Sequence, residues 1–162
     1  MTTSTPRLAR VRFTDEATQA MVAEVQQEYV RRYGGPDETP IEPGVFEPPL
    51  GAFFLAHDAD GTAVAMGGWR FRDDVHPWGL SPVTEVKRMY VVPAARRRGY
   101  ARAVLRHLEE TARQAGAVVM VLETGTQQPE AIAMYVAEGY ERIENYGHYA
   151  WSPSNRCFAK RL

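Results

Sequence analysis

The sequence contains little cysteine and no long apolar run, and both shortages limit what the chain can be. Cys157 is the single cysteine among 162 residues, so an internal disulfide and a cysteine-based zinc site are excluded. This usage agrees with a reducing compartment, and we expect a cytoplasmic protein. No stretch approaches the ~20 consecutive apolar residues that a membrane span requires. The N-terminal MTTSTPRLARVRF also lacks the apolar core of a signal peptide, so we expect no membrane partner.

An excess of positive charge is missing as well. The 19 basic and 20 acidic residues give a net charge of −1, so no global basic field is present to attract a nucleic acid. We expect no nucleic-acid partner. The histidines are scattered without the spacing of metal ligands, and we expect no metal. They are His57, His76, His107 and His148.

The length and the ordinary composition favour one globular domain over residues 1–162. Only Met1 to Thr5 are expected to be loose. The rest alternates strand patterns, helix patterns and turn signals, and this predicts a mixed α/β fold. The expected elements in chain order are a strand at Leu8–Phe13, a helix from Thr14 or Asp15 to Arg32, a proline-rich loop at Asp37–Leu50, hairpin strands at Gly51–His57 and Thr62–Phe71, a strand at Val83–Val92, a helix to Ala115, a strand at Ala117–Glu123, a helix from Pro129 to Gly139, and strands at Tyr140–Glu144 and Arg156–Leu162.

The most informative stretch lies between the strand that Pro93 stops and the helix that follows it. It is a short basic turn that reads R-x-x-G-x-A at Arg96, Gly99 and Ala101. The first turn of a helix has N–H groups without intrahelical partners, and the helix dipole is positive there. Gly99 has no Cβ, so a ligand can approach the backbone closely. The pattern therefore favours a phosphate-binding turn, although it is neither GxxxxGK[ST] nor GxGxxG.

The arginines of this turn have two interpretations. Arg96, Arg97 and Arg98 can add charge and forked donors for a phosphate. The alternative for Arg97 and Arg98 is a solvated basic patch.

The turn and its flanks resemble the GNAT superfamily of acyl-CoA-dependent N-acyltransferases. The matching segments are KRMYVVPAARRRGYARAVL and LETGTQQPEAIAMYVAEGY. The resemblance implies a mostly antiparallel mixed sheet of six to seven strands with helices on both faces. It also implies that the strands ending at Val92 and near Glu123 splay apart to admit acetyl-CoA. The expected reaction is direct acetyl transfer to a primary amine of a small molecule, or of a peptide, in a ternary complex. Relatives often form homodimers, but no feature of this sequence requires one.

The resemblance also assigns the cofactor site. The turn would hold the pyrophosphate, and the backbone around Tyr90 would pair with the pantetheine arm as an added strand does. Thr124 would bind substrate or pantetheine, or it would only cap a turn. The implied cofactor-binding residues are Met89, Tyr90, Val91, Arg96, Arg97, Arg98, Gly99, Tyr100, Ala101 and Thr124.

Glu85 is the expected general base. An amine with a pKa of roughly 10 is mostly protonated at neutral pH, and a carboxylate can take that proton directly or through water. Strand alternation places Glu85 on the same face as Met89 and Val91. The alternative is a structural ion pair with Lys87, Arg88 or Arg70.

Tyr135 is the expected general acid, because AIAMYVAEGY matches the family's A-x-x-x-Y-x-x-x-G-[F/Y]. Its phenol would protonate the departing thiolate, although a buried aromatic beside Ile132 is the alternative and both can hold. The presence of Glu85 and Tyr135 argues against a non-catalytic acyl-CoA-binding module. The candidates for lining the acceptor pocket lie in loops and are Tyr33, Phe46, His76 and Tyr146.

Overall fold

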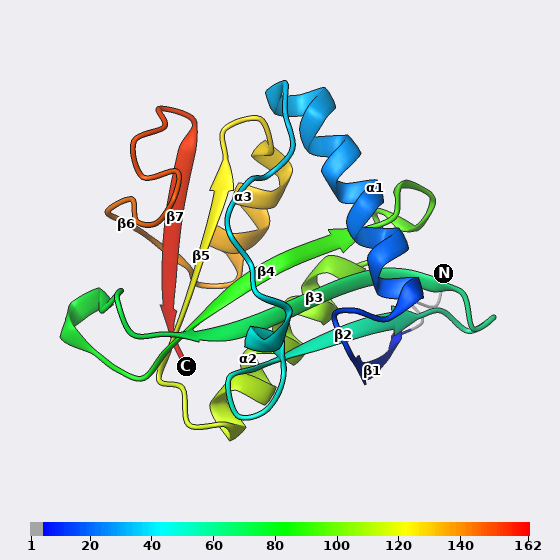
Figure 1. Cartoon of the computed structure of the whole chain (residues 1–162), viewed down its shortest axis with the longest axis horizontal. Coiled ribbons are helices and arrows are strands. Elements are labelled where there is room, and N and C mark those ends of the chain that lie inside the picture. Colours follow the sequence, from blue (N-terminus) through cyan, green and yellow to red (C-terminus); the bar gives the residue numbers. More distant parts are fainter. Residues whose placement is uncertain (1–4) are drawn as a thin grey trace.

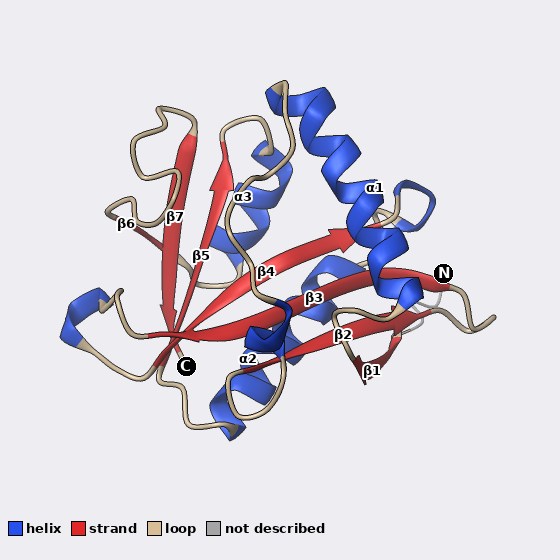
Figure 2. Cartoon of the chain, in the orientation of Figure 1, coloured by secondary structure: helices blue, strands red, loops and turns tan. Residues whose placement is uncertain are grey.

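A computed structural model describes residues 5–162, and it contains one seven-stranded sheet with helices on both faces (Figure 1, Figure 2). The mixed α/β class and the strand number are as predicted. Of the N-terminal segment expected to be loose, only Thr5 lies within the described residues. The strands are β1 Arg7–Val11, β2 Gly51–His57, β3 Ala63–Arg72, β4 Val83–Val91, β5 Val119–Gly125, β6 Glu141–Ile143 and β7 Asn155–Arg161; the helices are α1 Glu16–Tyr33, α2 Tyr100–Gln114 and α3 Pro129–Ala137; and the 3₁₀ turns are η1 Pro43–Phe46, η2 Pro77–Gly79 and η3 Pro93–Ala95.

The two faces of the sheet carry separate cores. Helix α2 buries its apolar stripe against one face, with Val104, Leu105 and Leu108 fully enclosed, and α3 packs into the same core. A Cβ at Gly67 would lie 3.0 Å from Val104, so the glycine lets α2 lie close to β3. Helix α1 and turn η1 cover the opposite face. No helix within residues 5–162 is long and apolar enough to cross a membrane.

Within residues 5–162 the strand order is β1-β2-β3-β4-β5-β7-β6, and the only parallel neighbours are β4 and β5. These two strands pair only over Val83–Glu85 and Val119–Val121. Beyond those residues they diverge, as Figure 1 shows. The gap confirms the splay that the family resemblance implied. It also leaves the backbone of β4 beyond Glu85 without a partner from β5.

A β-bulge interrupts β4 just beyond this point. Tyr90 pairs with Met66 and Lys87 pairs with Gly68, so Arg88 and Met89 together face Gly67. Arg88 has a left-handed φ of 54°. The extra residue shifts the alternation of side chains by one.

The prediction that Glu85 shares a face with Met89 and Val91 is therefore wrong. Met89 and Val91 pack into the α2 core, and so does Val86. Glu85 is the neighbour of Val86 and points to the other face, because strict alternation holds only up to the bulge. Tyr90 lies in the α1 core, opposite Met89 and Val91 as expected.

Candidate active site

The turn between β4 and α2 forms a concave set of backbone donors. Arg97 and Gly99 both adopt left-handed conformations, with φ of 65° and 80°. Within the described part of the chain, the N–H groups of Arg97, Arg98 and Gly99 have no hydrogen-bond partner. They precede the first turn of α2, whose own N–H groups point the same way. Successive amides in such a conformation form an anion-binding nest, here at the positive end of a helix.

The arginine side chains of this turn have different surroundings. The Arg96 guanidinium donates to Glu28 of α1 at 2.7 Å and to the carbonyl of Val91 at 3.0 Å. It therefore ties the turn to α1 and β4 through its Nε and Nη2 atoms. Arg97 and Arg98 are exposed to solvent. The Tyr100 side chain is buried in the α2 core, so this residue offers the turn only its backbone.

A small cavity of about 60 Å³ lies in the gap between β4 and β5. Tyr135 of α3 reaches it and is 7% exposed. Burial raises the pKa of Tyr135 above its ordinary value of 10.0, and the nearby Tyr29 adds to the shift. Its hydroxyl makes no hydrogen bond within residues 5–162, while its ring packs edge-on against Tyr140 at 5.9 Å. Tyr135 is thus a buried aromatic whose protonated hydroxyl has access to the gap.

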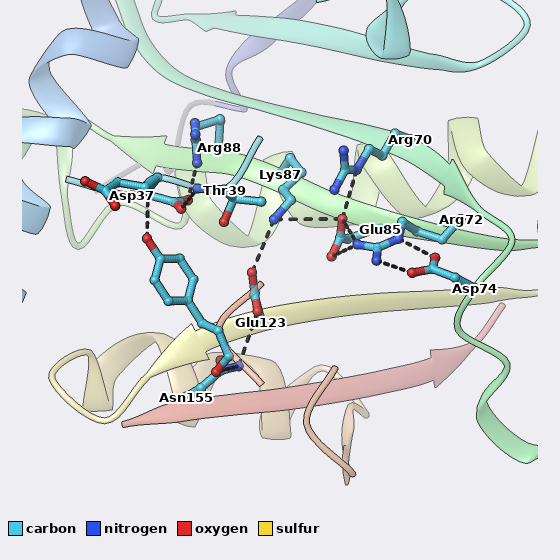
Figure 3. Close-up of polar contacts among 12 residues, drawn as sticks. Asp37, Thr39, Arg70, Arg72, Asp74, Glu85, Lys87, Arg88, Glu123 and Asn155 are labelled. Atoms are coloured by element: carbon cyan, nitrogen blue, oxygen red, sulfur yellow. Dashed lines mark hydrogen bonds and ion pairs between the residues drawn. The ribbon is translucent and has the colours of Figure 1, made fainter. Parts of the chain in front are cut away.

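Glu85 is surrounded by three cations (Figure 3). Its carboxylate is completely buried and accepts from Arg70 and Arg72 at 3.0 Å, with Lys87 at 3.8 Å. Burial alone would raise the pKa of Glu85, but Lys87, Arg72 and Arg70 outweigh it and hold the pKa below its ordinary value. Glu85 lines neither cavity. This geometry is that of the structural ion pair, with the carboxylate enclosed by its cationic partners.

A second carboxylate, Glu123, was missed by the sequence reasoning, which treated it only as the end of a buried strand. It lies on β5 two residues beyond Val121, where the pairing with β4 ends. Its side chain is 14% exposed and lines both cavities. Lys87 and Asn155 donate to its two oxygens, each at 3.3 Å (Figure 3). One feature could have identified it as a candidate: Glu123 lies at the carboxyl end of the strand that the resemblance places beside the gap, and ligands bind at such strand ends.

The larger cavity has a volume of about 460 Å³ and opens beside the gap. It lies between the end of α1, the loop that follows α1, the end of β5, the start of α3 and the β6–β7 loop. The residues that line it are Tyr29, Tyr33, Gly34, Gly35, Pro36, Asp37, Glu38, Glu123, Thr124, Gly125, Gln128, Tyr149, Trp151, Ser152, Ser154 and Asn155.

Of the four predicted acceptor-pocket residues, only Tyr33 lines this cavity. Phe46 is 1% exposed and packs in the α1 core, because η1 turns its ring toward the sheet. His76 is exposed in the β3–β4 loop, with Nε2 2.8 Å from the carbonyl of Asp73. Tyr146 is partly buried and packs against a third apolar cluster, and burial of its hydroxyl and the charge of Glu85 raise its pKa. These three residues do not line the predicted pocket.

An ion pair joins β4, at the edge of the gap, to the loop that follows α1 and lines the larger cavity. The bulge carries the Arg88 side chain to the α1 face, where it pairs with Asp37 (Figure 3). Asp37 lines both cavities, and Arg88 lines the small one. Thr39 N–H also donates to Asp37 at 2.9 Å. The loop following α1 is therefore anchored to β4 at the point where the two cavities meet.

The candidate site thus consists of an anion-binding turn, a split between β4 and β5, and two cavities at that split. A sequence profile of the Acetyltransferase (GNAT) family matches residues 14–140. The chain belongs to this family, which confirms the resemblance found in the sequence. It is an acetyltransferase, and membership implies the use of an acyl-CoA.

Individual relatives agree with this assignment. The chain is 38% identical over 109 residues to an IAA acetyltransferase of Azospirillum brasilense, covering 67% of each chain. It is 32% identical over 100 residues to an aminoglycoside N(6')-acetyltransferase type 1 of Stenotrophomonas maltophilia, covering 61% of this chain and 65% of that one. A crystal structure of an acyl-CoA N-acyltransferase from Klebsiella pneumoniae superposes with a TM-score of 0.76 at 24% identity, covering 97% of both chains. That structural likeness shows the shared fold.

The anion-binding turn gives a first prediction. Gly99→Ala places a side chain at a φ of 80°, which costs about 1–2 kcal/mol of strain and distorts the nest. We expect the Kd for coenzyme A, measured by calorimetry, to rise about tenfold, equivalent to ~1.4 kcal/mol.

Gly116→Ala is the matched control. Gly116 has a φ of 102°, with open space around it, at the other end of α2. It should lose similar stability and keep its affinity for coenzyme A. Equal losses of affinity in both variants would show that the turn has no special part in binding.

Proposed function

We propose that the protein transfers the acetyl group of acetyl-CoA to a primary amine of a small molecule, by direct attack within a ternary complex. One observation carries the proposal: the gap cavity and the larger cavity lie next to each other and share five lining residues. Donor and acceptor can therefore approach the gap from its two sides. The residues that line both cavities are Tyr29, Asp37, Glu123, Thr124 and Gln128.

The donor side fits coenzyme A. The nest around Arg97 and Gly99 has unpaired amides for the diphosphate, and Arg97 and Arg98 add exposed charge. Beyond the bulge, the edge of β4 at Met89–Val91 has no partner from β5, so a pantetheine arm can add there as a strand does. A backbone N–H on this edge can polarise the thioester carbonyl.

Two side chains that line the gap, Glu123 and Tyr135, can accept and donate the protons that the reaction requires. Glu123 replaces Glu85 as the proposed base, because it reaches the larger cavity and Glu85 does not. The amine gives a proton to Glu123, directly or through water, and its nitrogen attacks the carbonyl carbon. The carbon–sulfur bond then breaks, and the Tyr135 hydroxyl donates its proton to the departing sulfur. The acetylated nitrogen gives up its remaining surplus proton, which restores the Tyr135 hydroxyl, and Glu123 releases its proton to solvent. Lys87 and Asn155 orient the Glu123 carboxylate.

The shape of the larger cavity supports a small acceptor. The backbone N–H of Glu38 donates to the Tyr149 hydroxyl at 2.7 Å, so the loop after α1 and the β6–β7 loop meet over it. A cavity of about 460 Å³ lies within the range of small-molecule sites. The name of the Stenotrophomonas relative, an aminoglycoside acetyltransferase, also favours a small-molecule amine over a protein.

The test is release of free thiol from acetyl-CoA across a panel of amines, with the acetylated product identified by mass spectrometry. We expect thiol and acetylated amine to appear in equal amounts with at least one amine. Binding of coenzyme A without thiol release from any amine would instead favour the non-catalytic acyl-CoA-binding module.

A further inference from the structure

The charged side chains that line the larger cavity are all of one sign. Its lining includes three acidic residues, Asp37, Glu38 and Glu123, and none of its lining residues is lysine, arginine or histidine. The cavity thus presents acids, aromatic rings and neutral polar groups to whatever enters it.

Two of the three acidic residues are paired with cations that do not line this cavity. Arg88 pairs with Asp37, and Lys87 pairs with Glu123. Both cations are buried and line only the small cavity in the gap. They compensate the charges of Asp37 and Glu123, so these two acidic residues add little net charge to the larger cavity.

Glu38 has no such compensation. Its side chain is exposed and forms no ion pair with any residue from 5 to 162. The hydrogen bond from its backbone to the Tyr149 hydroxyl at 2.7 Å fixes its position on the cavity wall. It therefore gives this wall a net negative charge, which attracts an ammonium and repels a carboxylate.

Aromatic rings form the rest of the entrance. Trp151 is 77% exposed and Tyr33 is 37% exposed, although both line the cavity. Rings left open at the mouth of a cavity offer apolar area to a ligand, and their faces attract cations. The absence of a Cβ at Gly125 makes room for the Tyr33 ring, whose hydroxyl would lie 2.0 Å from such an atom. The ring is thereby held against the end of β5.

We propose that the acceptor is a compact cationic amine that carries no carboxylate, with an apolar or aromatic body that packs against Tyr33 and Trp151. This inference rests on the proposed function and narrows it. An arylalkylamine satisfies the cavity, because its ammonium meets Glu38 and Glu123 and its ring meets the aromatic entrance. A free amino acid does not, because its carboxylate would lie among acids without a cation to bind it.

The test compares amines that differ only by the carboxylate: 2-phenylethylamine with phenylalanine, and tyramine with tyrosine. Thiol release from acetyl-CoA gives kcat/KM for each compound. We expect each decarboxylated amine to exceed its amino acid by about tenfold or more, as one unfavourable charge contact predicts.

A charge reversal at the cavity wall checks the cause. Glu38→Lys should raise KM for 2-phenylethylamine and reduce the preference over phenylalanine by about tenfold, with kcat little changed. Glu42→Lys is the matched control, since Glu42 is exposed on the same loop and outside the cavity lining, and it should leave the preference unaltered.

The outcomes separate the two proposals. Phenylalanine and 2-phenylethylamine used equally well would overturn this inference and leave the acetyltransfer to a small amine standing. An unchanged preference in Glu38→Lys would also overturn it. No thiol release from any of the four compounds or the wider panel, with coenzyme A still bound, would overturn the proposed function and this inference with it.

Discussion

Replacing Tyr135 with phenylalanine is expected to lower kcat about 100-fold and to leave the Kd for coenzyme A nearly unchanged. A general acid contributes 10²–10⁴-fold in typical enzymes, and the burial that raises the pKa of Tyr135 keeps its proton in place at neutral pH. Folding stability should change by less than about 0.5 kcal/mol, because the hydroxyl makes no hydrogen bond within residues 5–162 and the ring remains. Single-turnover rates and thermal unfolding measure the two quantities.

Tyr140→Phe is the control for Tyr135→Phe. The two rings touch in the same core, but the Tyr140 hydroxyl donates to the buried Glu109 carboxylate at 2.9 Å. Its loss should cost about 1.5–3 kcal/mol of stability, as hydrogen bonds to charged groups do, with kcat retained. If Tyr135→Phe kept full kcat, the proton for the leaving sulfur would have to come from another group.

Much of the fold could be predicted because local patterns determine it. The apolar stripe of α2 and the proline and glycine at the ends of the helices gave most boundaries within a few residues. Gly34, for example, ends α1 in a left-handed conformation, with its N–H bonded to the carbonyl of Val30. The splay of β4 from β5 has no such local signal, and only the family resemblance implied it.

The errors arise where long-range packing decides. The segment KRMYV contains no local signal for a bulge at Arg88. The bulge depends on how β4 pairs with β3, which lies elsewhere in the sequence. It moved Glu85 to the face opposite Met89. Phe46 lies in a proline-rich segment whose sequence does not tell whether its ring faces the core or the solvent, and η1 buries it. From the sequence alone, Glu123 is only the last residue of a predicted strand. Its place at the gap follows from the end of the β4–β5 pairing at Val121, which the sequence does not show.

Glu123→Gln should lower activity and Glu85→Gln should lower stability, although Lys87 contacts both carboxylates. Glu123→Gln is expected to lower kcat/KM about 100-fold near neutral pH, as loss of a general base does. The deficit should shrink as pH rises, because more of the amine is then neutral without help. Its stability should change little, since its contacts to Lys87 and Asn155 are both 3.3 Å long and partly exposed.

Glu85→Gln removes a completely buried carboxylate that three cations share, and breaking such a cluster costs about 3–5 kcal/mol. Because the pKa of folded Glu85 lies below the ordinary value of 4.5, its ion pairs stabilise the fold fully above that pH. Their contribution is lost as pH falls through the lower pKa of the folded state. The stability difference from the parent protein, measured by urea unfolding, should therefore be large at pH 7 and shrink toward pH 3. The opposite result would contradict this assignment. If Glu85→Gln were stable but inactive and Glu123→Gln were active, Glu85 on β4 would be the general base.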